Sequence, residues 1–143
     1  MSLLPLRDLH ILVLEDEFII ALDLESLCRD HGAADVTVCA SIDELGSDPF
    51  SLPFNLAIVD VMLGGMPTLD FARQLEERGI PFVFATGYSA SEGMLRDFPD
   101  VPVVTKPFSP ESVIQALSQA TRRTEDLGNS APRASGGVRA EDL

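Results

Sequence analysis

Three acidic residues lie just after short apolar runs of the sequence, where their carboxylates could share a cation. Glu15 and Asp16 follow the run at 11–14, and Asp60 follows the run at 56–59. If the two runs are neighbouring strands, these carboxylates converge, and like charges ~4 to 5 Å apart repel each other by several kcal/mol at intermediate dielectric. A cation must therefore lie among them, and carboxylate oxygens with room for water suit Mg²⁺.

Two further residues with phosphate-binding chemistry follow other apolar runs. Lys106 comes after the run at 101–104 and is the only lysine in the chain, whereas Thr86 follows the run at 82–85. A lysine ammonium is a compact, flexible charge that suits a phosphoryl oxygen, and threonine adds a hydroxyl donor. Carboxylate, divalent metal, ammonium and hydroxyl around one point are the parts of phosphoryl transfer to an aspartate nucleophile. Asp60 alone could equally cap the following turn, and the combination favours the chemistry.

The elements that position these residues are short strands alternating with helices. The four apolar runs have the length and the β-branched and aromatic content of strands buried on both faces of a parallel sheet. A fifth stretch, 36–40, has the pattern of an edge strand. Helical patterns follow at 17–31, 67–78 and 109–123, with weaker ones at 41–47 and 90–97. Five strands alternating with five helices predict a doubly wound α/β domain, because parallel strands need crossover connections.

Some local features of these elements can also be predicted. Ser109 followed by Pro110 is typical of a helix N-terminus. Residues 18–20, Phe-Ile-Ile, are expected in the core, and the glycine pair at 64–65 is expected to form a flexible loop after Asp60.

Length and charge limit the domain organisation and the partners. The 143 residues allow one compact domain, which we place at 1–121. Residues 122–143 contain few large apolar side chains, and we expect a flexible or disordered tail. The tail holds four arginines and four acids, so the whole net charge of −13 falls on the domain. Nucleic acid would be repelled. The sequence shows no signal peptide and no membrane-spanning run, which predicts a cytoplasmic protein that does not bind membranes.

Taken together in this order, four motifs resemble the receiver domain of two-component response regulators over residues 9 to about 121. They are Leu-Glu-Asp-Glu at 14–17, Ile-Val-Asp at 58–60, Ala-Thr-Gly at 85–87 and Thr-Lys-Pro-Phe at 105–108. The resemblance implies a flavodoxin-like (βα)5 fold with strand order 2-1-3-4-5. It also implies a phosphorylation-dependent switch in a phosphorelay that acts through protein contacts.

The same resemblance implies a role for each site residue. Asp60 would accept a phosphoryl group from a histidine kinase or a histidine phosphotransfer protein. Glu15, Asp16 and Asp60 would hold Mg²⁺, together with the backbone carbonyl of Met62. Thr86 and Lys106 would contact the phosphoryl oxygens, and the Lys106–Pro107 peptide bond would be cis. A further, unknown protein would read the output. Beyond self-catalysed phosphotransfer and autodephosphorylation, we expect no enzymatic activity.

Three positions concern switching and the lifetime of the phosphorylated state. Residues 81–88 resemble stand-alone receivers of alphaproteobacteria with a Phe-x-Thr-Gly-Tyr-like motif, which ends here at Tyr88. Typical receivers carry Tyr or Phe three residues before the lysine, where this chain has Val103, so Tyr88 is a candidate replacement. Met62 and Tyr88 also occupy the positions from which a polar side chain can orient an attacking water. Neither of these two side chains orients a water well, which predicts a long-lived phosphorylated state.

Two other functions share part of this pattern. A Mg²⁺-dependent phosphohydrolase would also use an aspartate nucleophile, but it needs a second acid two residues after Asp60, where Met62 stands. A flavodoxin-like cofactor carrier would need a phosphate-binding first loop, and the loop here is acidic. His10 and His31 lack ligand partners at metal-binding spacing, and Cys28 and Cys39 are expected to be reduced core residues.

Overall fold

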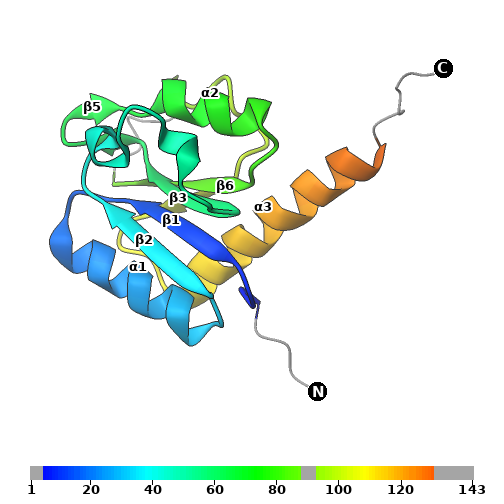
Figure 1. Ribbon diagram of the computed structural model, residues 1–143, viewed down its shortest axis with the longest axis horizontal. Helices are drawn as coiled ribbons and strands as arrows, with labels where there is room; N and C mark the ends of the chain where they lie inside the picture. Colours follow the sequence, from blue (N-terminus) through cyan, green and yellow to red (C-terminus); the bar gives the residue numbers. More distant parts are fainter. Residues whose placement is uncertain (1–4, 88–92, 131–143) are drawn as a thin grey trace.

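The chain forms one parallel five-stranded sheet with helices on both faces (Figure 1). The computed structural model describes residues 5–87 and 93–130, with side chains described as far as residue 124. The order across the sheet is β2-β1-β3-β6-β7, which is 2-1-3-4-5 in chain order and confirms the predicted fold. The strands are β1 (His10–Leu14), β2 (Asp35–Cys39), β3 (Leu56–Asp60), β6 (Phe82–Thr86) and β7 (Val103–Thr105).

The two faces of the sheet are covered by different helices. α1 (Phe18–Asp30) and α3 (Pro110–Ser130) pack on one face, whereas α2 (Leu69–Glu77) packs on the other (Figure 1). Side chains of β1 alternate between the two cores: Ile11 and Val13 join the α1–α3 side, and Leu12 and Leu14 the α2 side. A strand buried on both faces accounts for the continuous apolar runs in the sequence.

Two of the five predicted helices show no α-helix in the part of each that the structure describes. The pattern at 41–47 forms a short 3₁₀ helix, η1 (Ile42–Leu45), followed by a second, η2 (Pro49–Ser51). Gly46 adopts a positive φ of 83° directly after η1 and ends it. The pattern at 90–97 falls partly outside the described residues, and residues 94–97 form turns. The segment 41–47 holds too few residues before its glycine to sustain α-helical hydrogen bonding.

The last helix is longer than its pattern indicated. Its start agrees with the prediction, because the amide of Ser112 donates to Ser109 Oγ at 3.1 Å. Its end lies at Ser130 instead of residue 123, so the first part of the predicted tail, residues 122–130, is helical. No glycine or proline occurs from Glu111 to Leu127 to interrupt the hydrogen bonding.

The first turn of α1 corrects another expectation. Phe18 and Ile19 are 74% and 72% exposed, and Ile20 is half-buried, although all three were expected in the core. The helical period turns Ala21, Leu24 and Cys28 toward the sheet, which places the first two residues of the helix outside. Since Phe18 and Ile19 lie beside the acidic loop, they become part of the surface next to the site.

The segment after Asp60 is a hairpin where a loop was expected. β4 (Met62–Leu63) pairs antiparallel with β5 (Met66–Pro67). Gly64 and Gly65 make the turn with positive φ values of 58° and 80°, as a two-residue hairpin turn requires. The glycine pair therefore has a defined conformation.

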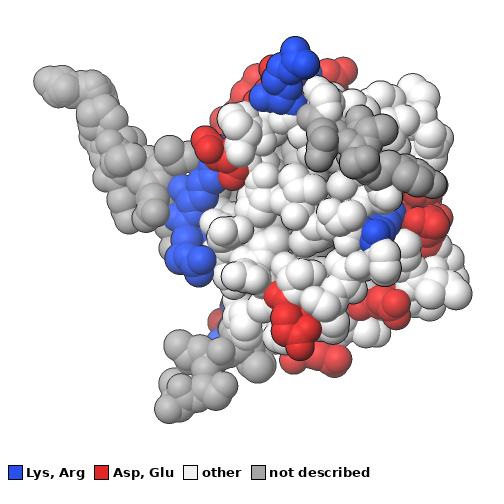
Figure 2. All heavy atoms as spheres, turned by 180° about the vertical axis from the view of Figure 1, so that it is seen from behind, with Lys and Arg blue, Asp and Glu red and all other residues white. Residues whose placement is uncertain are grey.

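Charged side chains are unevenly distributed over the surface of this protein, whose net charge is −13. In the view from behind, charged side chains lie mostly around the margin of a face whose centre is uncharged (Figure 2). Within the described residues, no helix combines the length and apolar character needed to cross a membrane.

Candidate functional site

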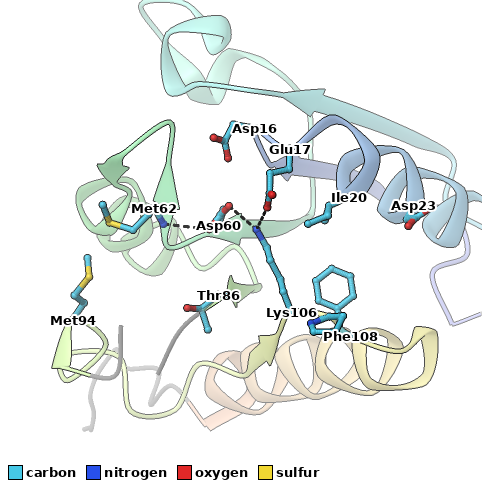
Figure 3. A pocket seen from close by; sticks show the side chains of 12 residues that line it. Asp16, Glu17, Ile20, Asp23, Asp60, Met62, Thr86, Met94, Lys106 and Phe108 are labelled. Carbon is cyan, nitrogen blue, oxygen red and sulfur yellow. Dashed lines mark hydrogen bonds and ion pairs between the residues drawn. The ribbon is translucent and has the colours of Figure 1, made fainter. Parts of the chain in front are cut away.

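The predicted site residues meet at the carboxyl ends of four strands (Figure 3). Glu15 and Asp16 follow β1, whereas Asp60 and Thr86 are the last residues of β3 and β6. Lys106 follows β7, and its amide donates to the Thr86 carbonyl at 2.8 Å. Parallel pairing brings these strand ends to one edge of the sheet, where ligands bind in open α/β folds.

The three carboxylates converge at this edge. Glu15, Asp16 and Asp60 each offer an oxygen within 4.8 Å of the others. Glu15 and Asp60 are buried, at 2% and 5% exposed, whereas Asp16 is exposed. Burial raises the pKa of Glu15 above its usual 4.5, although Lys106 partly offsets the effect. Burial thus limits the screening by water of two of the three charges, those of Glu15 and Asp60.

The cation among these carboxylates is the Lys106 ammonium. Its Nζ lies 2.8 Å from Glu15 Oε1, 3.0 Å from Asp60 Oδ2 and 3.3 Å from Glu17 Oε1. Burial of the ammonium works to lower its pKa, but the nearby carboxylates of Glu15 and Asp60 outweigh that effect. The net result raises the pKa of Lys106 above its usual 10.5. One ammonium is therefore shared by three carboxylates.

The donor set fits a hard divalent cation. Glu15 Oε1 is buried and, despite its short distance to Lys106, has no hydrogen-bond donor in suitable geometry among the described residues. A buried carboxylate oxygen without a hydrogen bond is costly, and a metal ion would satisfy it. Glu15, Asp16 and Asp60 could hold Mg²⁺ here. The Met62 amide donates to Asp60 Oδ1 at 3.2 Å, which directs this backbone segment toward the site.

An open cavity of about 840 Å³ surrounds Asp60 and Lys106. Asp60, Thr86 and Met62 line one side of this cavity. The residues that line its other side were not predicted from the sequence. That second side reaches along α1 and the segment after β7, with Ile20, Asp23 and Phe108 in its lining (Figure 3). The cavity is large enough for a phosphoryl group together with a side chain that delivers it.

Solved structures with the same architecture identify the family. SdrG from Sphingomonas melonis Fr1 is 33% identical, with 85% of this chain and 99% of that chain covered and a TM-score of 0.66. The REC domain of the PhyR response regulator from Erythrobacter litoralis is 26% identical over 81% and 92% of the two chains, with a TM-score of 0.65. A response regulator receiver protein from Sinorhizobium medicae WSM419 is 26% identical over 82% and 97%, with a TM-score of 0.67. The chain belongs to the response regulator receiver family. No protein-family model and no curated protein matches it.

Two residues of this receiver's site had not been singled out for a role. Glu17, the third acid of the first loop, reaches Lys106, and its place next to Asp16 was the available signal. Thr68 is 2% exposed, and its hydroxyl donates to the backbone carbonyl of Asp60 at 2.7 Å. The position of Thr68 just before α2 marks it as a helix-start residue, but the sequence does not reveal its contact with β3.

The remaining predicted positions that the structure describes differ in how they lie relative to the cavity. The Lys106–Pro107 peptide bond is cis. Met62 lines the cavity and is 41% exposed. Val103 is 42% exposed at the start of β7 and outside the cavity lining near Asp60. Tyr88 lies outside the described residues. Thr86, only 8% exposed, lines the cavity beside Asp60.

Proposed function

We propose that this receiver is a phosphorylation-dependent switch that takes a phosphoryl group onto Asp60 from a histidine kinase or a histidine phosphotransfer protein. The observation that carries the proposal is the position of Asp60. It ends a buried strand within 4.8 Å of the Glu15 and Asp16 oxygens, and the chain's only lysine lies 3.0 Å away. An aspartate buried for structural reasons alone would need neither the acid pair nor the lysine.

The residues around Asp60 have different roles in the proposed phosphoryl transfer. The Met62 amide and the Lys106 ammonium each hold one carboxylate oxygen of Asp60, which orients the group for attack on phosphorus. A phosphorus–oxygen bond to Asp60 forms as the phosphorus–nitrogen bond to the donor histidine breaks. Lys106 and Thr86 then lie beside the charge on the transferred oxygens. Glu15, Asp16 and Asp60 would hold Mg²⁺, which would supply further neutralisation of that charge.

An exposed apolar surface beside the site supports a protein donor. Phe18, Ile19 and Leu22 are 74%, 72% and 45% exposed on α1, which starts directly after the acidic loop. Large exposed apolar residues grouped on one helix mark a contact surface. A donor seated on α1 would place its phosphohistidine over the cavity. The downstream protein that reads the phosphorylated state remains a separate, unidentified partner.

The subgroup is a finer part of the proposal. Phe84, Ala85, Thr86 and Gly87 match the Phe-x-Thr-Gly-Tyr-like motif of stand-alone receivers in alphaproteobacteria. The exposed Val103, at the position where receivers usually carry Tyr or Phe, supports a different coupling residue, for which we propose Tyr88.

Incubation with a small acyl phosphate and Mg²⁺ tests the proposal by intact-protein mass spectrometry. The expected product carries one phosphoryl group, an added mass of about 80 Da. Asp60→Asn should abolish the adduct, and Asp30→Asn, at the exposed end of α1, is the matched control that should keep it. Stoichiometric labelling of Asp60→Asn at Glu15 or Asp16 would refute the assignment. Continuous turnover of phosphate esters would favour the phosphohydrolase instead.

A further inference from the structure

Glu17 combines a fixed backbone with a free side chain. Its amide donates to Glu15 Oε2 at 3.0 Å, and its carbonyl accepts from the Ala21 amide at 2.9 Å at the start of α1. The carboxylate, in contrast, is 62% exposed and touches the site only through Lys106, at 3.3 Å. Only the side chain of Glu17 can therefore move without disturbing the acidic loop.

The Lys106 ammonium is surrounded by carboxylates. An ammonium carries three N–H groups, and three carboxylates, those of Glu15, Glu17 and Asp60, lie within 3.3 Å of Nζ. Asp60 and Glu17 accept hydrogen bonds from Nζ at 3.0 and 3.3 Å, whereas Glu15 forms an ion pair. Because three carboxylate oxygens already surround Nζ at contact distance, a phosphoryl oxygen takes the place of one of them. Glu17 has the longest of the three distances, and its side chain is 62% exposed against 1% for Glu15 and 8% for Asp60. Release of Glu17 returns its charge to water, whereas release of Glu15 would leave a buried charge unpaired.

We propose that Glu17 is a positioning residue that accepts a hydrogen bond from Lys106 in the resting protein and leaves when the phosphoryl group arrives. This inference rests on the proposed function. Lys106 exchanges an exposed carboxylate for a phosphoryl oxygen and keeps its other contacts. Glu17 thus holds the ammonium at the site before transfer and opposes transfer slightly, because its contact must break and its charge repels the incoming group.

The single lysine makes this exchange directly observable. Protein labelled with ¹³C and ¹⁵N only in lysine gives one side-chain NMR signal set, that of Lys106. In the resting state with EDTA, Glu17→Gln and Glu17→Asp should both displace this signal from its wild-type position. Glu17→Asp keeps the charge but is one methylene too short to reach Nζ. Asp23→Asn removes a cavity-lining charge from the same helix and should displace the signal least.

Phosphorylation by a small acyl phosphate with Mg²⁺ gives the second comparison. The Lys106 signals of wild type and Glu17→Gln, separate at rest, should coincide once mass spectrometry shows full phosphorylation. Glu17→Gln should also be phosphorylated about twofold to fivefold faster than wild type, the size expected for loss of one exposed ion pair.

Two results would overturn the inference. Identical resting signals in wild type and Glu17→Gln would show that the contact does not form. An unchanged separation after phosphorylation would show that Glu17 is not released. Failure of the wild type to accept a phosphoryl group would refute the proposed function, and the resting comparison would still decide whether Glu17 contacts Lys106.

Discussion

Thr68 and Asp60 are joined by a buried hydrogen bond, in which the threonine hydroxyl donates to the aspartate's backbone carbonyl at 2.7 Å. The Thr68 amide also donates to the Val61 carbonyl at 3.0 Å. These contacts close the hairpin of β4 and β5 and tie the start of α2 to the end of β3. Thr68 thereby helps to fix the backbone that carries the Asp60 carboxylate.

Thr68→Val should lower the free energy of unfolding by about 1–3 kcal/mol, because it removes the hydroxyl donor and leaves a buried carbonyl without its partner. Thr68→Ser keeps the hydroxyl and should lose less. Urea unfolding in EDTA measures both. Equal stability of Thr68→Val and wild type would show that the hydrogen bond does not hold the hairpin.

Lys106→Met should lower the free energy of unfolding by about 1–3 kcal/mol at pH 8 in EDTA, because Glu15 and Asp60 lose their shared cation. The pKa of Lys106 is raised in the folded protein above its usual 10.5. Its charge therefore contributes fully below pH 10.5, and the contribution disappears as the pH rises through the folded value. The difference between variant and wild type should narrow above pH 10.5. A stability difference that widens above pH 10.5 would contradict a raised pKa of Lys106 in the folded protein.

Asp16→Asn should weaken Mg²⁺ binding and stabilise the metal-free protein. It removes one of three converging carboxylates, and the gain should be at most about 1 kcal/mol because Asp16 is exposed. Thermal melting in EDTA and Mg²⁺ titration measure the two effects. A lower melting temperature of Asp16→Asn than of wild type in EDTA would mean that the carboxylates do not repel one another as argued.

Met62→Asn combined with Tyr88→Glu should speed loss of the phosphoryl group about tenfold or more, equivalent to about 1.4 kcal/mol in the barrier. A thioether accepts hydrogen bonds weakly, so Met62, which lines the cavity, holds an attacking water poorly. Wild-type phosphoprotein should persist for minutes to hours in Mg²⁺ buffer, as followed by mass spectrometry. Decay within seconds, or no acceleration in the double variant, would show that other residues control the lifetime.

Neither cysteine should react with a thiol reagent in the folded protein at pH 8. Burial raises the pKa of the Cys28 thiol to about 12, and it also raises the pKa of Cys39. Ellman's reagent should therefore detect both thiols only in urea. Ser26→Cys, on the exposed side of α1, should add one thiol that reacts in the folded protein. Rapid reaction of the wild type would show that α1 or β2 opens readily.

The sequence alone was sufficient to predict the parallel sheet and the convergence of Glu15, Asp16, Asp60, Thr86 and Lys106. Strands buried on both faces leave continuous apolar runs, and in a parallel sheet the residues that follow those runs meet at one edge. Both features follow from local composition and from connection rules, so no knowledge of distant contacts is needed.

Tertiary structure decided the contacts that depend on packing and on distance between segments. The exposure of Phe18 and Ile19 depends on where α1 sits over the sheet, and the hydrogen bond from Thr68 to Asp60 depends on how the hairpin folds back. Glu17 reaches Lys106 across 89 positions of sequence, so its place next to Asp16 could indicate nearness to the site but not this contact. A side-chain contact between distant segments is set by three-dimensional packing, because helical and strand periodicity report only on neighbours along the chain.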